Sequence, residues 1–280
     1  MLQRIMVPTD GSAESEKALA IAQEVAKAQG AEVRLVRVAE DLAWVAARGE
    51  FSASPEILEE LLEKSEADAR ANLAGLVDRL AANGVRASSL IVRGSPAGAL
   101  LDCVEEEHPD LVAMATHGRT GLARFTLGSV TDRVVREGQA PVLVIRRSSE
   151  PTHKLESAVL MLDGSGVAEE TLPMVHELAR KPLMHVKLLR VVSDPSDRGA
   201  AHNYLEGAAA RLAADGLDTE LVVDVGSPEP IIERLALEAD FVILCTHGRS
   251  GIDRLRHGSV AEHVIHEVDC PVLLVRARAQ

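Results

Sequence analysis

The stretch that decides the fold is THGRTGLARFTLGSV, residues 116–130, because it returns as THGRSGIDRLRHGSV at residues 246–260. Both copies follow a short apolar run, at residues 111–115 and 241–245, and both precede a segment whose apolar residues have helical spacing. A glycine-spaced loop between a strand and a helix presents backbone N–H groups and the positive end of the helix dipole, a combination that holds phosphate. The repeat therefore predicts two strand–loop–helix units, each able to bind an anion.

The serine that ends each loop has two interpretations. Ser129 with Asp132, and Ser259 with Glu262, fit a capping box, which satisfies helix N–H groups without any ligand. In the other interpretation, each serine closes a phosphate loop. Capping does not account for the repeated glycines upstream, so the repeat favours a ligand. The spaced glycines are Gly118 and Gly128 in the first copy and Gly248 and Gly258 in the second.

The composition limits the classes of protein and partner. With 280 residues, of which 46% are hydrophobic, the chain can form one large domain or two modest ones with an ample core. A formal net charge of −13 argues against a nucleic-acid or anionic-membrane surface, because negative potential repels phosphate groups. Aromatic residues make up only 2%, which argues against the base-stacking surfaces of single-strand binders.

Targeting signals and cysteine usage indicate the compartment. The segment MLQRIMVPTDGS has no charged stretch followed by a long apolar run, and nowhere do 18 apolar residues follow one another. Cys103, Cys245 and Cys270 are an odd number without CxxC spacing, which indicates neither a disulfide framework nor a zinc site. We therefore expect a soluble, cytoplasmic protein in a reducing compartment.

Apolar runs and turn residues predict the same order of strands and helices twice. In the first half we expect strands at residues 5–9, 33–39, 89–92, 111–115 and 141–147, and helices at 14–29, 55–83, 97–106 and 130–139. In the second half we expect strands at residues 158–162, 186–192, 221–225, 241–245 and 271–276, a loop at 194–199, and helices after 165, at 204–214 and at 260–268. The second copy is shorter between its second and third strands. Pro141, before the fifth strand, is typical of an edge strand.

Each half is thus predicted to be an open, mostly parallel five-stranded sheet with helices on both faces, a Rossmann-like α/β fold. A repeat of this length indicates two whole domains, at residues 1–147 and 155–280, with a short polar linker between them. Such sheets bind ligands at the carboxyl ends of their strands, where the winding reverses direction. PTDGS at residues 8–12 and THGR at residues 116–119 both lie at those ends, so the two loops can meet over one crevice.

The whole chain resembles a tandem universal stress protein, with one such domain in each half. The nucleotide-binding branch of that family carries Gly-x2-Gly-x9-Gly followed by Ser or Thr. Gly118, Gly128 and Ser129 take the last positions of this pattern at the right spacing, and the second copy repeats them. Ala115 and Cys245 stand where the first glycine belongs, and a β-carbon there would crowd a phosphate or ribose.

The resemblance implies roles for individual residues. Asp10, flanked by Pro8 and Thr9, matches an aspartate near adenine and ribose, and Val38 matches the residue whose backbone meets the adenine edge. The implied phosphate and ribose loop starts at Ala115 and contains Gly118, Arg119, Gly128, Ser129 and Val130. The matching second-half residues are Asp163, Val191, Gly248, Arg249, Gly258, Ser259 and Val260. Because Met161 and Leu162 replace Pro8 and Thr9, we expect the second site to be the weaker one.

Several of these residues have a plainer alternative. Asp10 and Asp163 can each form an Asx turn at the start of a helix. His117 and His247 can act as acid or base, yet no carboxylate partner is evident in the motif, so an ordinary loop histidine is favoured. Arg119 and Arg249 can neutralise phosphate or simply be exposed. For Cys245, a role as a small buried hydrophobic residue is favoured over redox activity.

The function expected from the resemblance is that of a stress-response protein that binds ATP or a related adenine nucleotide and changes its partner interactions accordingly. Mg²⁺ is expected only with the nucleotide. The sequence contains no GxxxxGK[ST], SGGxDS or HxGH motif, so we expect no enzyme, or at most slow ATP hydrolysis. The family pairs domains through the fifth strand, which implies that residues 142–145 and 272–275 join the halves. Whether two chains form a homodimer is left open, and so is a nucleotide-free scaffold that acts through domain pairing and protein partners.

Overall fold

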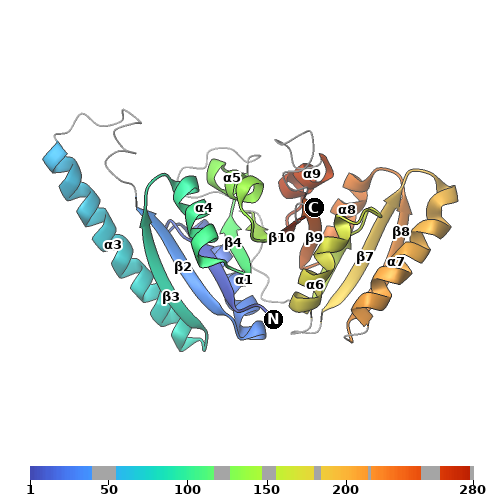
Figure 1. Ribbon diagram of the computed structural model, residues 1–280, viewed down its shortest axis with the longest axis horizontal. Coiled ribbons are helices and arrows are strands. Elements are labelled where there is room, and N and C mark those ends of the chain that lie inside the picture. Colours follow the sequence, from blue (N-terminus) through green and yellow to red (C-terminus); the bar gives the residue numbers. More distant parts are fainter. Residues whose placement is uncertain are drawn as a thin grey trace.

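The computed structural model describes residues 1–39, 55–116, 127–146, 156–179, 184–213, 216–246 and 259–277. Figure 1 shows two α/β halves side by side, with β10 near the middle and α3 and α7 at the two outer ends. The elements of the first half are β1 (Arg4–Pro8), α1 (Ala13–Gln29), β2 (Glu32–Ala39), α3 (Pro55–Ala82), β3 (Arg86–Arg93), α4 (Pro96–Glu107), β4 (Leu111–Ala115), α5 (Ser129–Glu137) and β5 (Val142–Ile145). Those of the second half are β6 (Ser157–Met161), η1 (Ala168–Thr171), α6 (Leu172–Ala179), β7 (His185–Val192), η2 (Pro195–Asp197), α7 (Arg198–Ala213), β8 (Asp218–Val225), α8 (Pro228–Ala236), β9 (Phe241–Thr246), α9 (Ser259–Glu267) and β10 (Val272–Arg276).

The described strands form one ten-stranded sheet in the order β3-β2-β1-β4-β5-β10-β9-β6-β7-β8. All pairs within a half are parallel, as predicted, and β5 pairs with β10 antiparallel, with Leu143 opposite Leu273. The predicted joining of the halves through their fifth strands is therefore confirmed. The expectation that Pro141 introduces an edge strand holds only within the half, because β10 covers the outer side of β5 and puts it at the centre of the sheet.

Two hydrophobic layers cover the faces of the sheet. On one face, Ile5 and Val33 pack with side chains from α1 and α3, and on the other face Met6 and Val36 pack with α4 and α5. Successive residues of β1 therefore alternate between the two cores, which is why this strand appears in the sequence as a short apolar run. The strand order reverses between β1 and β4 and again between β6 and β9, and parallel α/β sheets bind ligands at such switch points. The crevice expected there stays a prediction.

Local sequence explains most helix boundaries. Gly30 ends α1 in the left-handed conformation, with φ of 70°, and Pro96 begins α4 after Ser95, both as predicted. The predicted loop at 194–199 is wrong in part, because it contains η2 and the beginning of α7. The Asp194 side chain accepts a hydrogen bond from the Ser196 N–H at 2.8 Å, and this turn starts the helix early.

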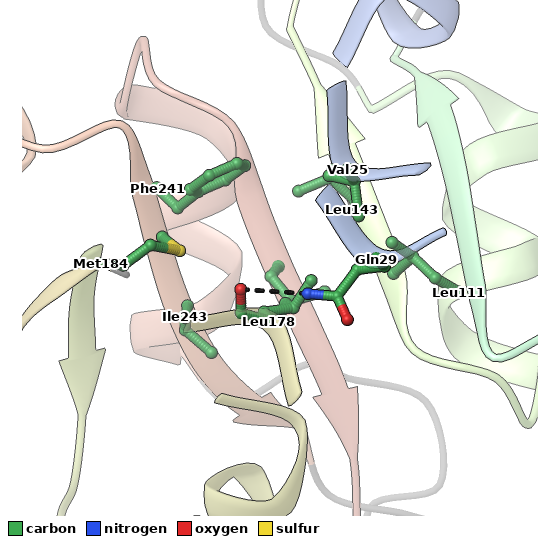
Figure 2. Close-up of a pocket in the computed structure, with 9 residues that line it drawn as sticks. Val25, Gln29, Leu111, Leu143, Leu178, Met184, Phe241 and Ile243 are labelled. Carbon is green, nitrogen blue, oxygen red and sulfur yellow. Dashed lines mark hydrogen bonds between the residues drawn. The ribbon is translucent and has the colours of Figure 1, made fainter. Parts of the chain in front are cut away.

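The junction between the halves has an apolar centre, next to which Gln29 makes a polar contact. A cavity of about 20 Å³ lies there, lined by Val25, Gln29, Leu111, Leu143, Leu178, Met184, Phe241, Ile243 and Leu273. Figure 2 shows Gln29 reaching across from the first half towards the backbone at Leu178. Its amide nitrogen donates to the carbonyl oxygens of Glu177 at 2.8 Å and Leu178 at 3.4 Å. The end of α1 thereby satisfies carbonyls at the end of α6.

Among the helices of the described residues, none has the length and apolar character needed to cross a membrane.

Candidate functional site

The turn between β1 and α1 holds Asp10 in a fixed position. Its Oδ1 accepts hydrogen bonds from the N–H of Ser12 at 3.0 Å and from the Ser12 hydroxyl at 2.5 Å, so the Asx turn is present. Ser12 in turn caps α1 by accepting from the Ser15 N–H at 3.2 Å. Thr9 is buried, and its hydroxyl shares a 3.0 Å hydrogen bond with Ser15 while accepting from the Gly11 N–H. The turn is thus pre-organised, with a partly exposed carboxylate at the tip of β1.

The start of α5 differs from the capping box that the sequence offers. The N-cap is Gly128, with φ of 77° and ψ of 133°, and Ser129 is already the first helical residue, with an exposed side chain. Asp132 pairs instead with Arg136, at 2.9 Å between Oδ1 and Nε. The capping-box interpretation of Ser129 is therefore wrong, because the glycine turns the chain into the helix one residue earlier. Among the described residues, no side chain caps α5 from its N-cap position. The first N–H groups of a helix have no partner within the helix itself.

Two contacts bring the start of α5 to the same edge as Asp10. Thr131, which is buried, donates its hydroxyl to the carbonyl oxygen of Ala115 at 2.8 Å and so ties the first turn of α5 to the end of β4. β4 lies beside β1, with Ile5 opposite Leu111, and β2 lies on the other side of β1. The structure thus brings together the carboxyl-edge residues Pro8, Thr9, Asp10, Val38, Ala115, Gly128, Ser129 and Val130. Val38 and Val130 are half-buried against the same hydrophobic core, which gives this edge an apolar side.

The second half repeats the Asx turn in a more open form. Oδ1 of Asp163 accepts from the Ser165 N–H at 2.9 Å and from its hydroxyl at 2.6 Å, and Asp163 is exposed. Gly164 has φ of 91°, and a β-carbon there would lie 2.7 Å from the Arg190 guanidinium, which stacks over the Tyr204 ring at 4.7 Å. Leu162 is buried where the first half has the hydroxyl of Thr9. The side chain of Arg190 therefore fills the space beside this turn.

The remaining second-half residues follow the first-half pattern. Val191 lies near the end of β7, and Ser259 and Val260 open α9 at the same carboxyl edge. Several predicted site residues fall outside the described residues; these are Gly118, Arg119, Gly248, Arg249 and Gly258. The neighbouring His117 and His247 fall there too.

The sequence was compared with protein families and with known proteins. The model of the universal stress protein family matches residues 1–146 and again residues 156–276. The chain belongs to the universal stress protein family. A universal stress protein of Mycolicibacterium smegmatis is 25% identical over 293 residues, which covers 98% of this chain and 97% of the relative. One from Methanocaldococcus jannaschii is 33% identical over 147 residues, covering 52% of this chain and 84% of the relative.

A solved structure shares the whole fold. The crystal structure of a universal stress protein from Archaeoglobus fulgidus matches with a TM-score of 0.78 at 19% identity, covering 98% of both chains. At this identity the likeness concerns the fold alone. The tandem arrangement of two universal stress protein domains is thereby established together with the α/β class.

The cysteine at the first glycine position of this universal stress protein is not set up for reaction. Burial, together with the nearby Glu170 and Asp163 carboxylates, raises the pKa of the Cys245 thiol to about 12. A thiol with so high a pKa stays protonated at neutral pH and is a poor nucleophile. Cys245 was expected to be a small buried hydrophobic residue, and the structure places it half-buried near the end of β9.

Sequence reasoning missed the residues that support the site. Ser12 and Ser165 fix the two aspartates, and their repetition two positions after each aspartate was a readable signal. Thr131 gave a weaker signal, because a threonine in the first turn of a helix usually has no distant partner. For Arg190 the sequence contained no signal. This arginine lies in β7 and stacks on Tyr204 of α7, and only the packing of the two elements brings these residues together.

Proposed function

We propose that this universal stress protein binds an adenine nucleotide, ATP with its Mg²⁺, at the carboxyl edge of its first half and acts as a nucleotide-dependent regulatory module in the stress response. The supporting observation is the start of α5. Gly128 opens this helix without a side-chain cap from the described residues, and Thr131 holds it at the end of β4, beside the strand that carries Asp10.

The chemistry of this edge suits the two ends of a nucleotide. The N–H groups and dipole at the start of α5 favour the negative charge of a phosphate chain. A carboxylate accepts hydrogen bonds and suits ribose hydroxyls or the adenine amino group, which is the role proposed for Asp10. Val38 and Val130 supply apolar surface for a base. The protein's net charge of −13 makes such local donors necessary for an anionic ligand.

The first half is proposed as the stronger of the two sites. Its turn carries the buried Thr9 and the partly exposed Asp10, whereas the second half has Leu162 and an exposed Asp163. The Arg190 guanidinium beside Gly164 further narrows the space at the second turn. We propose no catalytic residue, and hydrolysis of bound ATP is expected to be slow because no general base is assigned. A cytoplasmic location is part of the same proposal.

A second candidate is a nucleotide-free scaffold. It is favoured by the β-carbons of Ala115 and Cys245 at the first glycine position and by the sheet that runs unbroken through both halves. On this view the carboxyl edges bind nothing, and the joined domains present surfaces to protein partners.

Isothermal titration calorimetry with ATP separates the two candidates. The nucleotide module predicts saturable binding to the unmodified protein, and Ala115→Gly should bind ATP more tightly because the crowding β-carbon is gone. ADP and AMP titrated in parallel identify the preferred nucleotide. Absence of binding at millimolar ATP to both proteins would favour the scaffold.

A further inference from the structure

Two arginines cross the junction between the halves in matching positions. Arg276, at the end of β10, donates from its Nη1 to the carbonyl oxygen of Gly138 at 2.5 Å, and Gly138 is the residue that follows α5. Arg146, just after β5, donates from its Nη1 to the carbonyl oxygen of Val268 at 3.0 Å, and Val268 is the residue that follows α9. Each half therefore holds the C-terminal end of a helix that belongs to the other half.

A helix C-terminus is a favourable place for an arginine side chain. The last carbonyls of a helix have no intrahelical partners, and the C-terminus carries partial negative charge. A guanidinium placed there supplies both the donor and the opposite charge, and charge-assisted hydrogen bonds are roughly twice as strong as neutral ones. Gly138 also sits close to its own helix, since a β-carbon on it would lie 2.5 Å from the carbonyl oxygen of Val134. A side chain therefore does not fit at the position whose carbonyl Arg276 binds.

Each arginine is also linked to the candidate site of its own half. Arg146 follows Ile145, whose carbonyl oxygen accepts from the N–H of Thr116 at 3.0 Å, where the first loop begins. Arg276 precedes Ala277, whose N–H donates to the carbonyl oxygen of Thr246 at 3.0 Å, where the second loop begins. At the other end of α5, Thr131 fixes the first turn to β4. A continuous set of bonded elements therefore runs from each site, through an arginine, to the helix that opens at the other site.

We propose that Arg146 and Arg276 couple the two candidate nucleotide sites of the chain, so that each site depends on a side chain from the other half. This inference rests on the proposed function, and it concerns how nucleotide binding in one half is regulated by the other half. Phosphate bound at the start of α5 acts on a helix whose far end is held by Arg276. Loss of that guanidinium frees the helix end, weakens the first site from a distance, and leaves the second half's own helix held by Arg146. Arg146 plays the reciprocal part for α9.

Hydrogen–deuterium exchange with mass spectrometry tests the coupling, because peptides from α5 and α9 report on the two halves separately. The proteins are the unmodified chain, Arg276→Ala, Arg146→Ala and the control Arg133→Ala, each measured without ATP and over a series of ATP concentrations. Arg133 is an exposed cation on α5 that pairs with Glu137 of the same helix at 3.1 Å, so the control removes a charge without touching the junction. Arg276→Lys, which keeps the positive charge, serves if the alanine variant does not fold.

Each arginine substitution should affect the helix of the opposite half. Without ATP, Arg276→Ala should speed exchange in α5 more than in α9, and Arg146→Ala should do the reverse. The ATP concentration that half-protects the α5 peptides should rise roughly fivefold or more in Arg276→Ala, as for a typical coupling between sites, and stay unchanged in Arg133→Ala. Arg276→Lys should show a smaller rise than Arg276→Ala.

Two results would overturn the coupling, and a third concerns the proposed function. Unaltered α5 exchange in Arg276→Ala would mean that the arginine does not hold the helix. Faster α5 exchange with an unmoved ATP midpoint would mean that the helix end and the site are independent. If ATP protects neither helix in the unmodified protein, the proposed function fails and the coupling of nucleotide sites fails with it, while an ATP midpoint that exists but does not move contradicts the coupling alone.

Discussion

At the scale of single residues, each half has an aspartate that forms an Asx turn, and for Asp10 we also propose a ligand. Oδ1 of Asp10 orders the chain into α1 through Ser12, and the same two hydrogen bonds hold the carboxyl group in place after β1. The turn and the nucleotide interpretations of this residue are therefore compatible. What separates them is charge, because an amide can form the Asx turn but lacks the negative charge of the carboxylate.

Asp10→Asn separates the two roles. The asparagine oxygen can accept both Ser12 hydrogen bonds, so the melting temperature should change little. ATP affinity should fall by roughly tenfold, because a hydrogen bond to a charged acceptor contributes more than one to a neutral acceptor. Calorimetry and thermal unfolding measure the two effects. Asp194→Asn, in the turn before α7, is the matched control and should leave ATP affinity unaltered; an equal loss in both variants would contradict the role of Asp10.

Alanine substitutions at Ser12 and Ser129 should differ in their effect on the free energy of unfolding. Ser12→Ala removes the cap of α1 and a partner of Asp10, and it should lower the free energy of unfolding by about 1 kcal/mol. Ser129→Ala should change it by no more than about 0.5 kcal/mol, because Ser129 is exposed and is not the cap of α5. Urea unfolding compares them directly. If Ser129→Ala lowered the free energy of unfolding as much as Ser12→Ala, Ser129 would after all act as the cap of α5.

At the scale of elements, the sequence predicts the centre of the sheet better than its edges. Inner strands such as β4 are buried on both faces and show as apolar runs with matching bounds. The outer strands β3 and β8 begin earlier than predicted, at Arg86 and Asp218, because half-exposed edge strands tolerate polar residues that hide their starts. The helix-start error at Ser129 has another cause: sequence does not reveal which glycine adopts a positive φ, and that of Gly128 moved the cap by one residue.

The edge strand β8 also carries a pH-sensitive contact. The Nδ1 of His185 lies 2.7 Å from Oδ2 of Asp218, and its Nε2 lies 3.2 Å from Oε2 of Glu220, near which Lys187 also lies. The hydrogen bond to Asp218, followed by the one to Glu220, raises the pKa of His185 in spite of some desolvation. A raised pKa in the folded state means that the stabilisation is fully present below the unfolded value of about 6.5 and is lost as the pH rises through the folded value.

The expected outcome is a difference in pH dependence. Between about pH 6 and pH 8.5, the melting temperature of the unmodified protein should fall more than that of His185→Gln, which has no charge to lose. Asp218→Asn should reproduce the flatter profile, since it removes the largest cause of the raised pKa. Parallel profiles in all three proteins would show that the contact does not contribute to stability.

At the scale of the whole molecule, the pairing of β5 with β10 turns two domains into one sheet with an apolar junction. The family resemblance implied the pairing, but the Gln29 and arginine contacts across it involve residues far apart in sequence. The two arginines repeat at matching positions of the halves, yet the sequence does not indicate which carbonyls they bind. Their existence depends on how the two halves sit together. The junction should therefore make the halves unfold as one unit.

Leu143→Ala tests that unit. Leu143 is buried opposite Leu273 and lines the junction cavity, so its truncation should cost about 2 to 5 kcal/mol and still leave a single unfolding transition. Differential scanning calorimetry measures both quantities. Leu237→Ala is the matched control, because that leucine is 83% exposed and should change stability by less than about 0.5 kcal/mol. Two separate transitions in the unmodified protein would contradict a single cooperative unit.

The most direct test of the nucleotide account is a crystal structure of the unmodified protein grown with ATP and Mg²⁺. The account predicts phosphate oxygens within hydrogen-bonding distance of the backbone N–H groups that open α5, at Ser129 and Val130, and ribose or adenine beside Asp10. Those N–H groups bonded to the protein's own atoms, with nucleotide missing from the carboxyl edge of the first half, would contradict it.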